Sequence, residues 1–153
     1  MLTTCNMNIQ KEEYTIEFGE ECDSLFIEHL NEVQLIGAEP FIDHITYIRA
    51  SQRGDLALVV ARDNGKVVGY LGFWIMNDPN HAVLQAQQAG FYLLEEYRKG
   101  FTAVKMIKEA EKVLKEDFEV STVLLVSTVK KDISPLFRYL DYQEAETTYI
   151  KEI

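Results

Sequence analysis

The stretch from Phe91 to Leu114 constrains the fold more than any other part of the chain. It begins as an apolar, aromatic strand, passes an acidic pair and a short basic turn with one glycine, and continues as an amphipathic helix. The apolar residues of the helical part recur at helical spacing at Val104, Ile107, Ala110, Val113 and Leu114. The stretch therefore predicts a strand, a tight loop and a helix start.

The turn between this strand and this helix suits an anion. The first backbone N–H groups of a helix lack partners within it, and the helix dipole adds a partial positive charge there. Arg98 and Lys99 bring two positive side chains to the same place, in a chain whose formal net charge is -10. An ordinary helix start with two solvated basic side chains gives the same pattern, so both interpretations stay open here. The turn matches neither the nucleotide phosphate loop nor the glycine-rich dinucleotide motif, because it contains too few glycines.

The remaining pattern predicts one mixed α/β domain over residues 1–153, with a parallel step across the long helix. We expect strands at 13–18, 56–61, 67–76, 82–94, 120–127 and 145–153. We expect helices from Cys22 to Ile36, over 41–50, from Val104 to Leu114, and over 134–140 with Ser134 as the cap. Asn64-Gly65 between two apolar runs is a strong hairpin signal, and the hairpin is expected at the centre of the sheet.

Composition narrows the classes of partner. The chain has 25 acidic against 15 basic residues, which argues against binding nucleic acid and favours a cationic acceptor such as a polyamine, an aminoglycoside, a lysine side chain or an N-terminus. The sequence shows no secretory signal, and its longest apolar run, 67–76, is about half of a membrane span. Cys5 and Cys22 are widely spaced and fit a reducing compartment. We therefore predict a cytoplasmic protein that binds no membrane.

The first helix carries polar residues that could serve as metal ligands. His29 and Glu32 have a His-x-x-Glu spacing beside Glu28, but no third ligand is recognisable nearby. We interpret them, and His44 on the second helix, as solvated side chains. No metal site is predicted.

The turn resembles the acyl-coenzyme A pyrophosphate loop of the GNAT family of N-acetyltransferases, whose motif is Arg/Gln-x-x-Gly-x-Gly/Ala. Arg98 matches its first position and Ala103 its last, while Phe101 stands where the family has its first glycine and Gly100 lies one residue earlier. The Gly-Lys-Val-Val-Gly-Tyr hairpin segment and the stretch 136–142, with Asp141 in place of a glycine, are similar to the family too. The resemblance covers most of the chain and is nearest to short, divergent members encoded in phage genomes. It implies a mostly antiparallel central sheet with helices on both faces, the acyl-CoA N-acyltransferase fold.

The resemblance also implies a site for acetyl-CoA as co-substrate. Two strands would splay apart near 88–93, with the pantetheine arm beside Tyr92, Leu93 and Leu94 and the backbone N–H near Leu93 stabilising the oxyanion. The pyrophosphate would lie on the N–H groups of the loop, with charge from Arg98 or Lys99. The loop residues concerned are Arg98, Lys99, Gly100, Phe101, Thr102 and Ala103.

The sequence offers no clear general acid and only candidates for a general base. Phe137 stands where the family commonly has a tyrosine that acts as the general acid, and a phenyl ring donates no proton. Tyr92 and Tyr142 are the other candidates for that role. Candidates for the general base are His81, at the start of the strand, and Glu95 or Glu96, at its end.

These observations predict an acetyl-CoA-dependent N-acetyltransferase that acetylates a primary amine, on a small molecule or a protein, by direct attack in a ternary complex. The alternatives are a catalytically inactive relative that binds a protein partner and a sensor that binds acyl-CoA without turnover. Exposed edge strands would permit a homodimer.

Overall fold

The computed structural model describes residues 6–35, 37 and 39–153. Cys5 and Ile36 lie outside the described residues. The elements follow in the order β1 (Met7–Lys11), α1 (Ile16–Val33), α2 (His44–Arg53), β2 (Leu56–Asp63), β3 (Lys66–Asp78), β4 (Val83–Leu93), the 3-10 helix η1 (Glu95–Tyr97), α3 (Thr102–Phe118), β5 (Thr122–Leu124) and α4 (Ser134–Tyr139). No helix among these described residues is long and apolar enough to cross a membrane.

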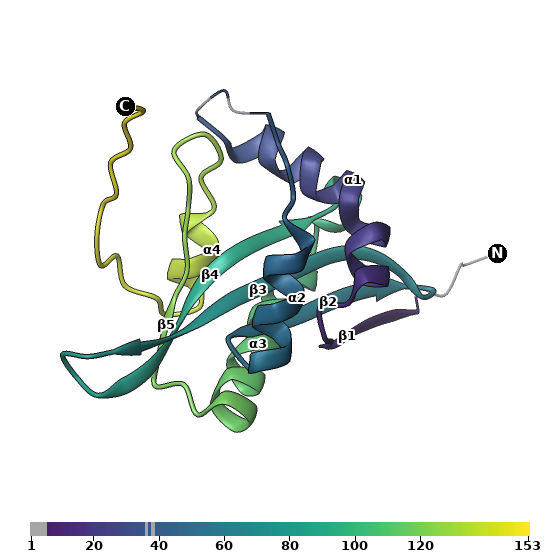
Figure 1. Cartoon of the computed structure of the whole chain (residues 1–153). Helices are drawn as coiled ribbons and strands as arrows, with labels where there is room; N and C mark the ends of the chain where they lie inside the picture. Colours follow the sequence, from purple (N-terminus) through teal and green to yellow (C-terminus); the bar gives the residue numbers. More distant parts are fainter. Residues whose placement is uncertain (1–5, 36, 38) are drawn as a thin grey trace.

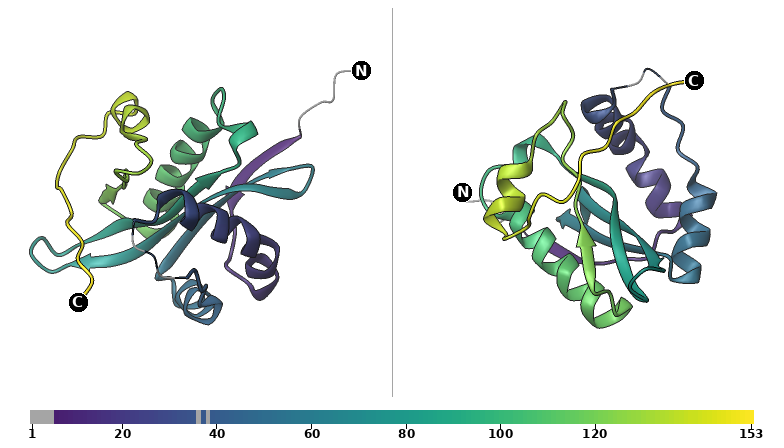
Figure 2. Two further views of the ribbon diagram at one scale, coloured as in Figure 1. Left: turned by 90° about the horizontal axis from the view of Figure 1, so that it is seen from above. Right: turned by 90° about the vertical axis from the view of Figure 1, so that its left-hand side faces the viewer.

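The strands form one sheet in the order β1-β2-β3-β4-β5 (Figure 1). The first three pairings are antiparallel, and β5 runs parallel to β4. α1 and α2 cover one face of the sheet, while α3 and α4 lie on the other (Figure 2). A mixed, mostly antiparallel sheet with helices on both faces is therefore confirmed.

The central hairpin forms as its turn residues predict. Asn64 and Gly65 have φ values of 50° and 83°, the left-handed conformation that a tight two-residue hairpin turn requires. β2 and β3 are buried on both faces, because successive side chains point to opposite sides of the sheet. Val59 and Leu71 pack against α3, whereas Val60 and Tyr70 pack against α1 and α2.

The predicted first strand, 13–18, is wrong. Thr15 caps α1 instead, and its side-chain oxygen accepts a hydrogen bond from Phe18 N at 3.1 Å. Phe18 and Cys22 lie one helical turn apart and are both buried, which the alternation of residues 13–18 concealed. The first strand is instead β1, at one edge of the sheet, whose polar sequence gave no strand signal.

Other boundaries also differ from the prediction, and α1 and α3 both begin earlier than expected. α2 begins at His44, after the capping residue Asp43, rather than near 41. Ser134 is the first residue of α4 and not its cap, and its N–H donates to Asp132 Oδ1 at 2.9 Å. β5 is shorter than the predicted 120–127. Residues 145–153 form no strand, because their side chains are exposed and their alternating pattern has no sheet face to cover.

Candidate functional site

β4 and β5 separate where the sequence places the acyl-CoA cleft. They pair only from Gln85 to Gln87, and the next contact is a hydrogen bond from Val126 N to Gln88 Oε1 at 2.9 Å. Ala89 then has no partner on β3, because the register shifts between Gly72 and Phe73. This bulge redirects β4, and its edge from residues 89 to 93 continues without a β5 partner (Figure 1).

Leu93 presents its backbone to this open edge. Leu94 N donates to Val68 O of β3 at 2.9 Å. Neighbouring residues of a strand direct their N–H and C=O groups to opposite edges, so those of Leu93 face away from β3. The N–H of Leu93 is thus directed into the gap beside the bulge, where a carbonyl oxygen could accept its hydrogen bond.

The start of α3 leaves backbone N–H groups without a side-chain cap at the turn where the sequence predicts an anion. Phe101 is the N-terminal cap residue and makes no side-chain capping bond, so the opening N–H groups of the helix remain available. Gly100 has a φ of 89°, a conformation that costs a glycine little, which meets the need for a sharp turn one residue before the family's position. The Phe101 side chain is 66% exposed and is not packed into the core. These residues fit a pyrophosphate.

Arg98 has partners that its place in the turn does not indicate. Its guanidinium makes no anion site of its own, because Nη1 and Nη2 donate to both carboxylate oxygens of Glu32 at 2.8 and 2.7 Å. Its Nε donates to Leu93 O at 2.7 Å, on the edge of β4 where the pantetheine arm was expected. The hydrogen bonds from Arg98 lower the pKa of Glu32. In this arrangement Arg98 lies in the gap itself, above the ring of Tyr92.

A polar cleft of about 370 Å³ surrounds this ion pair. It lies between α1, the loop after β4 and Lys131 of the segment before α4, and its carboxylates belong to Glu28, Glu32, Glu95 and Glu96. Lys130 Nζ donates to the backbone oxygen of Asn31 at 2.7 Å, which ties the same segment to the end of α1. The cleft therefore adjoins the open edge of β4.

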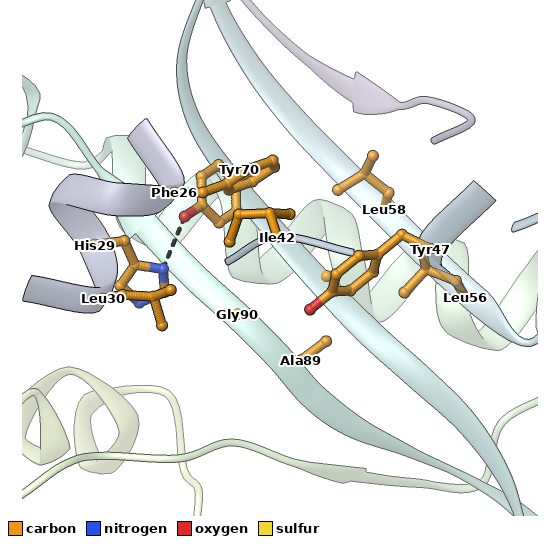
Figure 3. A pocket seen from close by; sticks show the side chains of 11 residues that line it. Phe26, His29, Leu30, Ile42, Tyr47, Leu56, Leu58, Tyr70, Ala89 and Gly90 are labelled. Atoms are coloured by element: carbon orange, nitrogen blue, oxygen red, sulfur yellow. Dashed lines mark hydrogen bonds between the residues drawn. The ribbon is translucent and has the colours of Figure 1, made fainter. Parts of the chain in front are cut away.

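A second, apolar cavity of about 110 Å³ lies on the α1 and α2 face of the sheet (Figure 3). We call it the apolar cavity. It is lined by Phe26, His29 and Leu30 of α1, Ile42, Tyr47 of α2, Leu56 and Leu58 of β2, Tyr70 and Gly72 of β3, and Ala89 and Gly90 of β4. Its floor includes the bulge of β4, whose edge borders the gap toward β5.

His29 is a site residue that the sequence analysis missed. It is not a solvated side chain, because its Nδ1 and the Tyr70 hydroxyl share a hydrogen bond of 2.7 Å and its ring stacks on Tyr92 at 5.2 Å. A methyl group at Gly90 would lie 3.5 Å from His29 Cε1, so the imidazole sits directly over the bulge. Burial lowers the pKa of His29 to about 4, which keeps the ring neutral near pH 7. Its contacts with Tyr70 and Tyr92, and not its spacing on the helix, distinguish His29 from a solvated histidine.

The other predicted residues are spread more widely. His81 lies in the β3–β4 turn, at the opposite end of β4 from Leu93, with its Nδ1 2.7 Å from Asp78 Oδ2 and its side chain 74% exposed. The structure therefore does not bring His81 together with the loop residues. Glu95 and Glu96 line the polar cleft.

The hydroxyl groups of Tyr92 and Tyr142 are bonded to carboxylates, and Phe137 lies in the core. Phe137 is 7% exposed and packs in the core beneath α3, beside the ring of Tyr142. The Tyr142 hydroxyl donates to Glu111 Oε1 at 3.0 Å, and the Tyr92 hydroxyl donates to Glu28 Oε2 at 3.2 Å. Burial raises the pKa of Tyr92 and of Tyr142.

His44 of α2 is held by two side chains. His44 is half-buried, since Nδ1 lies 2.8 Å from the Tyr14 hydroxyl and Nε2 lies 3.2 Å from Asp23 Oδ1. The interpretation of His44 as a solvated side chain is therefore wrong. Within the part of the chain that the structure describes, no three His, Cys, Asp or Glu side chains group as metal ligands.

Known structures share this fold. The ribosomal-protein-alanine N-acetyltransferase of Brucella melitensis biovar Abortus 2308 has a TM-score of 0.72 at 16% identity, over 96% of this chain and 99% of that one. An aminoglycoside acetyltransferase from an uncultured soil metagenomic sample has a TM-score of 0.74 at 13% identity, over 97% and 99%. A "predicted acetyltransferase with acetyl-CoA" from Clostridium acetobutylicum has a TM-score of 0.69 at 17% identity, over 95% and 96%. At these identities the likeness establishes the fold alone.

Comparison of the sequence with known families identifies the family of the chain. A search of curated proteins found no match. The model of the acetyltransferase (GNAT) family, however, matches residues 7–134, which include the whole sheet, the bulge of β4 and the loop before α3. The chain therefore belongs to the acetyltransferase (GNAT) family.

Proposed function

We propose that this protein is an N-acetyltransferase that transfers the acetyl group of acetyl-CoA to a primary amine in a ternary complex. The observation that carries the proposal is the open edge of β4, which runs from the bulge at Ala89 past Leu93 and ends at the uncapped start of α3. That path offers backbone groups to an extended amide-containing arm and then to a pyrophosphate.

The open edge of β4 and the start of α3 would each bind a different part of acetyl-CoA. The N–H groups from Lys99 to Ala103 would hold the pyrophosphate, with Lys99 adding charge. The N–H of Leu93 would donate to the thioester carbonyl oxygen, where negative charge develops during attack. Arg98 must leave Leu93 O before the pantetheine arm can pair with that carbonyl group.

Acetyl transfer forms one bond, breaks one bond and moves one proton. The amine nitrogen forms a C–N bond with the acetyl carbon, the C–S bond breaks, and the proton lost by nitrogen ends on the thiol of coenzyme A. Phe137 has no hydroxyl and the Tyr142 hydroxyl is bonded to Glu111, so we propose that water carries this proton. Under this proposal the protein contributes mainly positioning and the Leu93 hydrogen bond.

A second candidate function has its own support. The Arg98–Glu32 ion pair lies on the pantetheine path, and Phe137 replaces the tyrosine acid of the family. Both features fit a protein that binds acyl-CoA as a sensor, or binds a protein partner, without turnover.

The test is an assay of free thiol with acetyl-CoA and a panel of primary amines, combined with mass spectrometry of the amines. We expect thiol release together with an amine heavier by one acetyl group. Binding of acetyl-CoA without thiol release would favour the sensor. Absence of binding even at high acetyl-CoA would contradict both and leave the partner-binding role.

A further inference from the structure

The lining of the apolar cavity limits the charge of an acceptor that could bind there. Among the described residues that line it there is no carboxylate, lysine or arginine, and the polar side chains are those of His29, Tyr47 and Tyr70. Burying a charged group in such a site without a partner is costly. The carboxylates near β4 line the polar cleft instead. An acceptor with several ammonium groups, such as a polyamine or an aminoglycoside, therefore does not match this cavity.

The size of the cavity limits what can enter. A closed apolar cavity of roughly 150 Å³ is enough for a benzene ring. At about 110 Å³ the apolar cavity is smaller, so it accommodates a body of about four or five carbons. A short branched alkyl group fills such a volume well, and its contacts would be Leu30, Ile42 and Leu58.

The polar groups of the cavity lie toward the bulge. The Tyr47 hydroxyl points toward Ala89 and makes no hydrogen bond to any residue within 6–35, 37 and 39–153 (Figure 3). His29 lies over Gly90 on the same side and is neutral near pH 7, so it does not repel a nearby amino group. An amine with its alkyl body in the cavity can therefore direct its nitrogen to the backbone that separates the cavity from the gap.

We propose that the acceptor is a small primary amine with a branched apolar body, bound in the apolar cavity with its nitrogen between Tyr47 and the bulge at Ala89 and Gly90. This inference rests on the proposed function and names its substrate class. The neutral nitrogen attacks the acetyl carbon, the C–S bond breaks, and the displaced proton passes through water to the thiol. Tyr47 acts by holding the nitrogen.

Gly72 provides a way to fill the cavity without disturbing the sheet. A Cβ atom at this position would have Leu58, Ala57 O and Ala89 no nearer than 3.9 Å, which is ordinary contact. Gly72→Ala and Gly72→Val therefore add one and three carbons to the cavity in graded steps. Ile45→Ala is the matched control, because Ile45 is on α2 but is 59% exposed.

The experiment measures thiol release and calorimetric binding with 3-methylbutylamine, spermidine, kanamycin and a peptide that begins with leucine. We expect 3-methylbutylamine to have the highest kcat/KM. Gly72→Val should raise its KM and Kd about tenfold or more, Gly72→Ala less, and Ile45→Ala not at all, with the Kd of acetyl-CoA unchanged throughout. Tyr47→Phe should lower kcat/KM for this amine about tenfold.

The outcomes separate this inference from the proposed function. Thiol release with spermidine, kanamycin or the peptide but not with 3-methylbutylamine would overturn the inference and leave the transferase. Binding of 3-methylbutylamine that Gly72→Val abolishes, without thiol release from any amine, would support the cavity assignment and overturn the transferase. Failure of 3-methylbutylamine to bind, or binding that both Gly72 variants leave unchanged, would overturn the inference.

Discussion

The Arg98–Glu32 ion pair leads to a prediction in which stability and affinity move in opposite directions. Glu32→Gln removes the negative charge and one of the two charge-assisted hydrogen bonds to Arg98, while the bond to Leu93 O can persist. If Arg98 must leave the edge of β4 before acetyl-CoA binds, the variant makes that opening easier. The folded protein should therefore lose stability while its affinity for acetyl-CoA increases.

The magnitude follows from the burial of the pair. The two side chains are 28% and 26% exposed, which places them between surface pairs and fully buried ones. Surface pairs contribute about 0.2–1 kcal/mol, and breaking a buried pair costs about 3–5 kcal/mol. We expect Glu32→Gln to lower the free energy of unfolding by about 1–2 kcal/mol. If about 1 kcal/mol of this opposes opening, the Kd of acetyl-CoA should fall about fivefold.

The assay is urea unfolding for stability and calorimetric titration for affinity. Glu12→Gln is the matched control, because Arg62 holds Glu12 with two bonds of 2.8 and 2.9 Å at similar burial, away from the gap. It should cost a similar amount of stability and leave the Kd of acetyl-CoA unchanged. Because Arg98 lowers the pKa of Glu32, the stability difference between the wild type and Glu32→Gln should be full at neutral pH and shrink as the pH falls through that pKa. An unchanged or higher Kd for Glu32→Gln would refute the reasoning that Arg98 competes with acetyl-CoA.

Three further predictions concern single positions. Gly100→Val forces a branched residue into a φ of 89°, which costs about 1–2 kcal/mol, and calorimetry should show a higher Kd for acetyl-CoA at unchanged amine binding. Phe137→Tyr should destabilise the fold by about 1–3 kcal/mol in urea without accelerating thiol release, because the ring is in the core; a faster reaction would contradict this. Burial lowers the pKa of His29 to about 4 from 6.5, so about 3 kcal/mol of stability should be present above pH 6.5 and lost as the pH falls to 4. Urea unfolding at the two ends of this range, compared with His29→Gln, checks the loss, which the variant should not show.

Much of the fold could be predicted because local signals agreed with the packing. The hairpin combined an Asn-Gly turn with two apolar runs, and α3 combined helical periodicity with a strand before it. Residues 13–18 and 145–153 show where alternation alone misleads. The first runs into a helix that Thr15 caps, and the second alternates along a segment that pairs with no strand.

The site was predictable in its backbone and not in its side chains. The loop at Gly100 follows from the order strand, turn, helix, whereas Leu93 was indicated by the family resemblance. The partnership of Arg98 with Glu32 joins residues 66 positions apart, so no local pattern indicates it. The neutral state of His29 likewise depends on its burial in the folded chain, where it contacts Tyr70 of β3 and Tyr92 of β4.

The most direct test of the central claim is the backbone amide NMR spectrum of the protein during titration with acetyl-CoA. The account predicts that the amides of Leu93 and of residues 99–103 shift together with a single Kd, while the amides of β1, at the other edge of the sheet, do not move. If these amides stay unchanged while those of other segments shift, acetyl-CoA binds elsewhere, and the cleft between β4 and β5 is not its site.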